Sequence, residues 1–174
     1  MTIHTEHPFL PPEGERSPAR RFRGRLPAPV TVWTSGVLGS RPAGLTVSSM
    51  LVADGDPAEL IGLIDPDSDL ADAIADRGTV AVSLLGADDA RLAEAFAGLA
   101  PAPGGPFRSA AWTDTDWGPV LADGATWLGA RVHAEPDDSG WFRLIRATVE
   151  RIELGPNPEQ PLAHLRGRYG TLGR

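Results

Sequence analysis

The sequence predicts a mainly β protein, a β-barrel with two short helices in its crossovers. Three observations carry this prediction. About seven segments are rich in β-branched and apolar residues, two segments switch to a helical period, and most connections are short turns marked by glycine or proline. The 174 residues leave room for one such domain, and a hydrophobic content of 41% is enough to form its core.

The first three strands are expected between Val30 and Asp65. Residues 30–36 (VTVWTSG) alternate in β-favouring side chains and end at the Gly36 turn. Residues 43–52 (AGLTVSSMLV) mix β-branched residues with small hydroxyl side chains, and DGDP separates them from residues 59–65 (ELIGLID). The three segments predict a meander.

The next part of the chain carries both predicted helices. Leu70 and Ile74 fall on one helical face, with Asp67 or Ser68 as the N-cap and Gly78 as the stop. Residues 79–86 (TVAVSLLG) form the most apolar strand. The second helix is expected over residues 88–100, where acidic residues at the start suit the positive end of a helix.

The remaining segments complete the barrel. Residues 101–124 are rich in proline, glycine and tryptophan and are predicted to form a long ordered loop. Further strands are expected over residues 126–135, 141–154 and around 163–172, with a turn at 136–140. Residues 1–20 contain four prolines and no regular period, which predicts an arm, flexible or wrapped around a partner subunit, ahead of a domain over residues 21–174.

The charge and composition exclude several classes of protein. The net charge is −7 and no segment gathers enough arginine for a basic face, so nucleic-acid binding is not expected. All 16 basic residues are arginine, which excludes a Schiff-base or P-loop lysine. The chain has no cysteine, no apolar signal segment and no apolar run longer than a strand, so we expect a cytoplasmic protein without a membrane partner.

The usual catalytic motifs are absent, and the residues themselves indicate at most a binding site. No GxSxG, GxGxxG, HExxH or Walker-type pattern occurs, so no catalytic residue is assigned. His4 and His7 stand in the arm with too few further ligands, so no metal site is expected. The hydroxyl groups of Thr46, Ser48 and Ser49, together with the helix start at Ser68, could hold a polar ring and a phosphate.

The binding interpretation has a plain structural alternative. Serine is a common N-cap, so Ser68 has a structural reason to stand at the start of a helix. Asp65, Asp67 and Asp69 would also repel a phosphate dianion unless their carboxylates point away from it.

Five blocks of the sequence together resemble the flavin-reductase-like, FMN-binding split-barrel family. They are RLPAPVTVWTSG, RPAGLTVSSMLVADGDP, LIDPDSDLADAI, TVAVSLLG and LRGRYGTL, in the order and spacing of that family. The resemblance implies a split β-barrel that is usually a homodimer, binds FMN or FAD, and passes hydride from NADH or NADPH to the flavin. Many members serve as the reductase component of a two-component monooxygenase.

The resemblance also assigns roles to single positions of this sequence. The family's flavin-binding stretch falls on residues 46–49, its phosphate-binding serine on Ser68, and the asparagine of its next strand on Ser83. The implied cofactor-binding residues are Thr46, Val47, Ser48, Ser49, Asp65, Ser68 and Ser83. The implied residues on the substrate side are Trp141, Phe142 and Tyr169, although Ser83 and Tyr169 could instead serve only in packing.

Several departures from the family pattern leave the function open. Leu51, Val52 and Leu70 stand where family members often carry hydroxyl side chains, which weakens the expected phosphate and ribityl contacts. The family's Gly-Asp-His turn appears here as residues 140–142, Gly-Trp-Phe, so its histidine is missing. A flavin reductase is the first hypothesis, a non-catalytic FMN-binding protein for storage, sensing or delivery is the second, and a barrel that has lost its ligand is the third.

Overall fold

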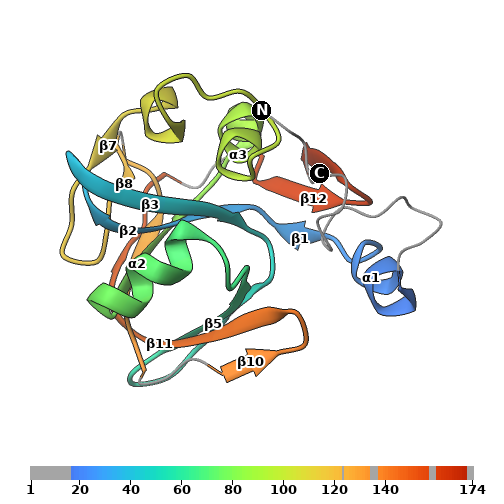
Figure 1. Ribbon diagram of the computed structural model, residues 1–174, viewed down its shortest axis with the longest axis horizontal. Coiled ribbons are helices and arrows are strands. Elements are labelled where there is room, and N and C mark those ends of the chain that lie inside the picture. The colour runs from blue at the N-terminus through green and yellow to red at the C-terminus, as the bar shows by residue number, and fades with distance from the viewer. Residues whose placement is uncertain (1–16, 123, 134–136, 157–159, 172–174) are drawn as a thin grey trace.

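The protein folds around one curled antiparallel sheet in a computed structural model that describes residues 17–122, 124–133, 137–156 and 160–171 (Figure 1). The strand order is β3-β2-β6-β9-β11-β5-β4, and β10 pairs with β11. The strands are β2 (Thr31–Val37), β3 (Ser40–Val47), β4 (Met50–Ala53), β5 (Glu59–Ile64), β6 (Thr79–Leu84), β9 (Trp127–Val132), β10 (Asp137–Ser139) and β11 (Phe142–Glu153). This is the predicted split barrel.

Two smaller sheets and several short helices accompany the main sheet. Strands β1 (Ala28–Pro29), β12 (Leu162–Leu165) and β13 (Arg168–Thr171) form a second sheet, and β7 (Trp112–Thr113) pairs with β8 (Val120–Leu121). The α-helices are α1 (Pro18–Arg23), α2 (Asp69–Arg77) and α3 (Ala90–Phe96), and the 3-10 helices are η2 (Ala87–Asp89) and η3 (Pro106–Ser109). None of the helices in these ranges is long and apolar enough to cross a membrane.

Helix α1 corrects the predicted count of two helices, because the described part of the chain holds three α-helices. The Ser17 side chain caps α1 by accepting a hydrogen bond from the Arg20 amide at 3.2 Å, and Pro18 occupies the first turn. Six residues are too few to show a helical period in the sequence. Residues 1–16 of the predicted arm, with His4 and His7, lie outside the described residues.

The predicted strand over residues 43–52 is two strands, broken by a bend at Ser48 and Ser49. Strand β3 is one edge of the sheet and β4 is the other, so the chain crosses between the two edges at this bend. The Leu63 amide of β5 donates a hydrogen bond to the Ser49 carbonyl at 2.9 Å. The bend therefore lies where the two edges of the sheet approach each other.

Five further short strands differ from the prediction. The last predicted strand is the β12–β13 hairpin, which turns at Arg166 and Gly167. Strand β10 occupies part of the turn predicted at 136–140, and β7 and β8 lie inside the predicted loop of residues 101–124. Each of these strands is only two to four residues long, which is too short for alternation to show.

Two apolar cores hold the fold together, one under α2 and one under α3. Helix α2 lies between the β2–β3 and the β5–β11 parts of the sheet (Figure 1) and buries Leu70, Ala71 and Ile74 against Trp33 and its neighbours. The predicted cap and stop are confirmed, because Ser68 is the N-cap and Gly78 ends the helix at φ 68°. The α3 core contains Leu92, Phe96 and Leu162.

Candidate functional site

The Ser48–Ser49 bend and the start of α2 are brought together by the end of β5. Leu63, which bonds to the Ser49 carbonyl, lies two residues before Asp65, and the turn from Asp65 to Ser68 leads directly into α2. Ser48 and Ser49 are half-buried, and their hydroxyls have no protein partner among the residues that the structure describes. Both hydroxyls can therefore donate a hydrogen bond to a ligand at this place.

The Ser68 hydroxyl is already used at the start of α2. It donates to the Asp65 carbonyl at 2.7 Å and accepts from the Ala71 amide at 3.2 Å. The Asp69 and Leu70 amides, by contrast, have no protein acceptor within the described ranges. Free amides at a helix start hold anions well, and Asp69 is exposed whereas Leu70 is fully buried, so the Asp69 amide fits a phosphate better than the Ser68 hydroxyl does.

Three carboxylates oppose an anion at this turn. The Asp65 carboxylate accepts the Asp67 amide at 2.9 Å, and the side chains of Asp67 and Asp69 are exposed to solvent. Solvent screens exposed carboxylates, so their repulsion of a phosphate is reduced but not removed. The turn fits a phosphate through its backbone, without a basic side chain of its own.

Thr46 and Val47 lie just before the bend and have structural partners. The Thr46 hydroxyl donates to the Ala93 carbonyl of α3 at 2.7 Å, and the Val47 carbonyl accepts from the Thr31 hydroxyl at 2.7 Å. The Thr46 oxygen keeps a lone pair and can accept a hydrogen bond from a ligand, but its proton is committed.

Ser83 lies on the same face of the sheet as Thr46 but is enclosed. Val32 pairs with Thr46 on one side and with Ser83 on the other, so the three residues form a row across β3, β2 and β6. Ser83 is 1% exposed, and its hydroxyl accepts the Leu121 amide of β8 at 3.2 Å. The structure therefore does not bring Ser83 to the open side of the bend.

Trp141 and Phe142 lie at the tip of the β10–β11 hairpin, next to the turn that precedes α2. Strand β11 begins opposite the end of β5, with Arg143 paired to Ile64. Trp141 is 77% exposed, whereas the Arg23 guanidinium lies 5.1 Å from the centroid of the Phe142 ring, a cation–π distance. One face of Phe142 is thus covered by Arg23, a residue that the sequence analysis missed; the arginine-rich run RRFRGR over residues 20–25 was the available signal.

Tyr169 lies on the β12–β13 hairpin and packs against the α3 core. It pairs with His164 across the hairpin, with ring centroids 5.5 Å apart. Burial raises the pKa of the Tyr169 hydroxyl, and the negative charge of Glu94 raises it further. This environment favours a neutral, packed tyrosine.

A comparison with protein families decides where this chain belongs. The family described as flavin reductase like domain matches residues 23–173. The chain belongs to the flavin reductase like domain family. No curated protein sequence matches this flavin reductase-like domain.

Solved structures of low sequence identity share the fold of this flavin reductase-like domain. The NADH:FAD oxidoreductase of Streptomyces globisporus C-1027, in complex with NAD and FAD fragments, is 24% identical with a TM-score of 0.79, covering 94% of this chain and 96% of its own. A flavin reductase domain protein of Arthrobacter sp. FB24 is 23% identical with a TM-score of 0.77, covering 90% and 94%. Component B of a nitrilotriacetate monooxygenase of Mycobacterium thermoresistibile is 24% identical with a TM-score of 0.77, covering 89% and 85%.

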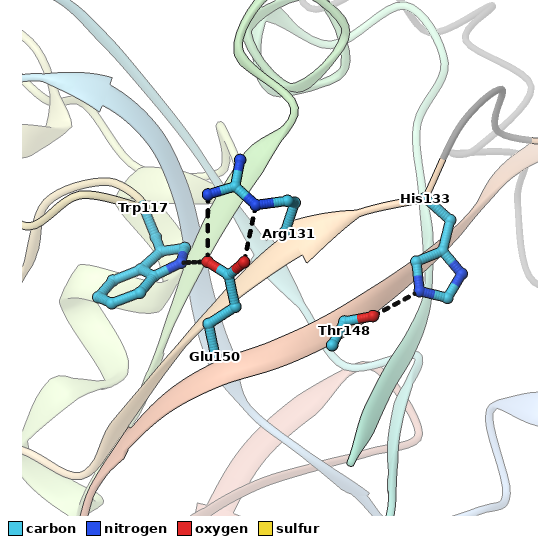
Figure 2. Close-up of polar contacts among 5 residues, drawn as sticks. All are labelled: Trp117, Arg131, His133, Thr148 and Glu150. Atoms are coloured by element: carbon cyan, nitrogen blue, oxygen red, sulfur yellow. Dashed lines mark hydrogen bonds and ion pairs between the residues drawn. The ribbon is translucent and has the colours of Figure 1, made fainter. Parts of the chain in front are cut away.

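A polar cluster on β9 and β11 holds Trp117 and contains none of the candidate site residues. Glu150 accepts hydrogen bonds from the Trp117 indole and from Arg131, each at 2.7 Å, and His133 bonds to Thr148 at 2.8 Å (Figure 2). The bonds from Arg131 and Trp117 lower the pKa of the Glu150 carboxyl. These contacts hold Trp117 against strands β9 and β11.

A pocket of about 390 Å³ lies apart from the Ser48–Ser49 bend. Leu84, Leu121, Thr126 and Pro156 contribute to its lining, and none of the sequence-predicted flavin residues lines it. The described residues contain no group of three or more histidine or carboxylate side chains placed to hold a metal ion.

The protonation of His164 should make the stability of the domain depend on pH. Burial lowers the pKa of His164 below its ordinary value of about 6.5, and the nearby charge of Arg23 lowers it further. Below pH 6.5 the unfolded chain therefore binds a proton that the folded chain resists, so the free energy of unfolding should fall as the pH drops from about 6.5 towards the folded pKa.

Urea titrations from pH 7.5 to pH 5 measure this dependence. His164→Gln should remove the step, and His133→Gln, which changes an exposed histidine, should retain it. A His164→Gln variant whose stability falls as steeply as that of the parent over this range would contradict the assignment.

Proposed function

We propose that this protein is a flavin reductase that binds FMN, with FAD as the alternative flavin, and transfers hydride to it from NADH or NADPH. Membership of the flavin reductase like domain family supports this proposal. The observation that carries it is that the bend with the unpartnered Ser48 and Ser49 hydroxyls bonds to Leu63 of β5, just before the turn that leads to the open Asp69 amide of α2. The polar ring edge and the phosphate of a flavin each need hydrogen-bond donors. The serine hydroxyls could serve the ring, and the start of α2 could serve the phosphate.

The residues of the site would bind and orient rather than exchange protons. A bound flavin supplies the hydride-accepting ring itself, so the protein needs no general acid or base for that step. Ser48 and Ser49 would donate to the polar edge of the ring, and the Asp69 amide would hold the phosphate. Fixing the ring at both ends restricts its orientation, which is the main contribution that the chain makes to the rate.

A non-catalytic flavin-binding protein is the second candidate function. The Gly-Trp-Phe sequence at residues 140–142 favours it, because Phe142 stands where the family histidine is expected and Arg23 covers one face of its ring. In that case the protein would hold FMN for storage, sensing or delivery without turnover.

We also propose a cytoplasmic homodimer that can serve a monooxygenase partner, as the family resemblance implies. Apolar side chains on the outer face of the sheet support a partner subunit there. Leu51 on β4 is opposite Ile61 on β5, Leu63 is opposite Leu144 on β11, and Leu51 is exposed. Ile61 and Leu63 alternate with the buried Leu60 and Ile64, so they face outward.

The visible spectrum of the purified protein with added FMN, followed by NADH or NADPH, tests the function. We expect FMN to bind and the nicotinamide absorbance at 340 nm to fall rapidly in the presence of excess FMN. Flavin binding without nicotinamide oxidation would support the second candidate function. A protein that binds neither FMN nor FAD would contradict both.

A further inference from the structure

Five arginines lie on or next to two segments that meet, α1 and the β12–β13 turn. The Arg166 amide donates a hydrogen bond to the Gly24 carbonyl at 2.8 Å, which joins the end of α1 to the hairpin. The arginine cluster, as we call it, consists of Arg21, Arg23, Arg25, Arg166 and Arg168. All five side chains are exposed, in a chain whose net charge is −7.

The arginine cluster carries uncompensated positive charge. Among the residues that the structure describes, no carboxylate forms an ion pair with any of its five members. The arginines on β9 and β11 differ; for example, Arg131 pairs with Glu150 and Arg146 with Glu59, each at 2.7 Å. The cluster therefore has guanidinium groups free to bind an external anion.

The backbone at Arg166 is held in a conformation that arginine rarely adopts. Arg166 has φ 52° and Gly167 has φ 79°, in a two-residue hairpin turn that usually carries Asn-Gly. In the left-handed region the Cβ atom of a residue other than glycine comes too close to the following carbonyl oxygen. Strain retained at one side chain is a reason to look for its function.

Exposed aromatic rings lie beside the arginine cluster. Arg23 lies on the Phe142 ring, which places the cluster next to the tip of the β10–β11 hairpin. Trp141 at that tip is 77% exposed, and Phe22 on α1 is 68% exposed. The same tip adjoins the turn before α2, because Arg143 pairs with Ile64.

We propose that the arginine cluster binds the phosphates of an adenine nucleotide, and that Trp141 offers a stacking face for its base. One guanidinium group can donate two parallel hydrogen bonds to a phosphate, and an exposed indole ring can stack on a purine base. This proposal rests on the proposed function in one respect: the nucleotide is the ADP part of a dinucleotide whose other half reaches the Ser48–Ser49 bend. FAD, NADH and NADPH all carry this part.

Calorimetric titration of ADP into the flavin-free protein tests the arginine cluster directly. Arg166→Asn removes one guanidinium and suits the left-handed turn, so the variant should fold at least as well as the parent. Its affinity for ADP should fall about tenfold, as expected for one lost charge-assisted hydrogen-bond pair. Arg25→Gln with Arg168→Gln should lower the affinity further, whereas Arg91→Gln, an exposed arginine on α3, should leave it unchanged.

Titrations of the dinucleotides identify the source of the bound ADP part. If the cluster holds FAD, Arg166→Asn weakens FAD binding and leaves FMN binding unchanged. If it holds the nicotinamide nucleotide, the same variant raises the KM for NADH or NADPH with FMN saturating, and an effect larger for NADPH would place the 2′-phosphate at the cluster.

The FMN titration separates this proposal from the proposed function. ADP binding that depends on Arg166, in a protein that does not bind FMN, would leave the arginine cluster assigned and remove the flavin reductase proposal. FMN binding with no ADP binding, or with all affinities equal in the parent and Arg166→Asn, would overturn the nucleotide site. Binding of polyglutamate in place of ADP would also overturn it, since the cluster would then receive an acidic protein segment.

Discussion

Replacing Ser68 with aspartate should weaken FMN binding by about tenfold and lower the free energy of unfolding by about 1 kcal/mol, because a carboxylate cannot donate the hydrogen bond that the Ser68 hydroxyl gives to the Asp65 carbonyl. Aspartate caps helices as well as serine does, so its carboxylate can still accept the Ala71 amide. The added negative charge would face a phosphate held by the Asp69 amide, where the exposed carboxylates of Asp67 and Asp69 already oppose it. The loss should shrink in high salt, because solvent ions screen exposed charges.

Ser68→Asn is the matched control for this variant. Asparagine also caps the helix but carries no charge, so its affinity for FMN should stay within about threefold of the parent. Quenching of FMN fluorescence measures the affinity, and urea titration measures the stability. Equal FMN affinity in the parent and Ser68→Asp would mean that the phosphate binds elsewhere.

Replacing Gly62 with alanine should destabilise the domain by about 2–3 kcal/mol. A Cβ atom at Gly62 would overlap the Trp33 ring, at 2.7 Å from Cζ2, and would lie 3.3 Å from the Ser49 carbonyl oxygen. Trp33 is fully buried in the core under α2, so the ring has no room to move aside. The same change should weaken FMN binding, since the Ser49 backbone must shift away from β5.

Gly170→Ala serves as the control for a glycine in a strand. An added Cβ at Gly170 meets no atom within 4 Å, and the residue is exposed on β13. We expect its free energy of unfolding to change by less than about 0.5 kcal/mol in urea titration. Similar stabilities for Gly62→Ala and Gly170→Ala would show that the Trp33 ring does not pack against Gly62.

The regular parts of the fold could be predicted because their signals are local. Residues 30–36 alternate in β-favouring side chains, and Leu70 and Ile74 repeat at a helical period behind the Ser68 cap. The break at Ser48 and Ser49 could not be predicted, because β-favouring residues continue on both sides without a glycine or proline. The bend follows from pairing with β2 on one side and β5 on the other, which is a property of the whole sheet.

The partners of the candidate site residues could not be read from the sequence. Thr46 bonds to Ala93 and Ser83 to Leu121, and each pair is far apart along the chain. The contact between Arg23 and Phe142 joins two residues that lie far apart along the chain, so a pattern of local spacing cannot predict it. Residue types indicated where hydroxyl groups would gather, and only the folded chain showed which of them remain free.

A crystal structure of the protein with bound FMN tests the central claim most directly. We expect the phosphate within hydrogen-bond distance of the Asp69 amide, and the polar edge of the ring at the hydroxyls of Ser48 and Ser49. FMN bound instead in the pocket lined by Leu84 and Leu121, with the start of α2 left in water, would contradict the account.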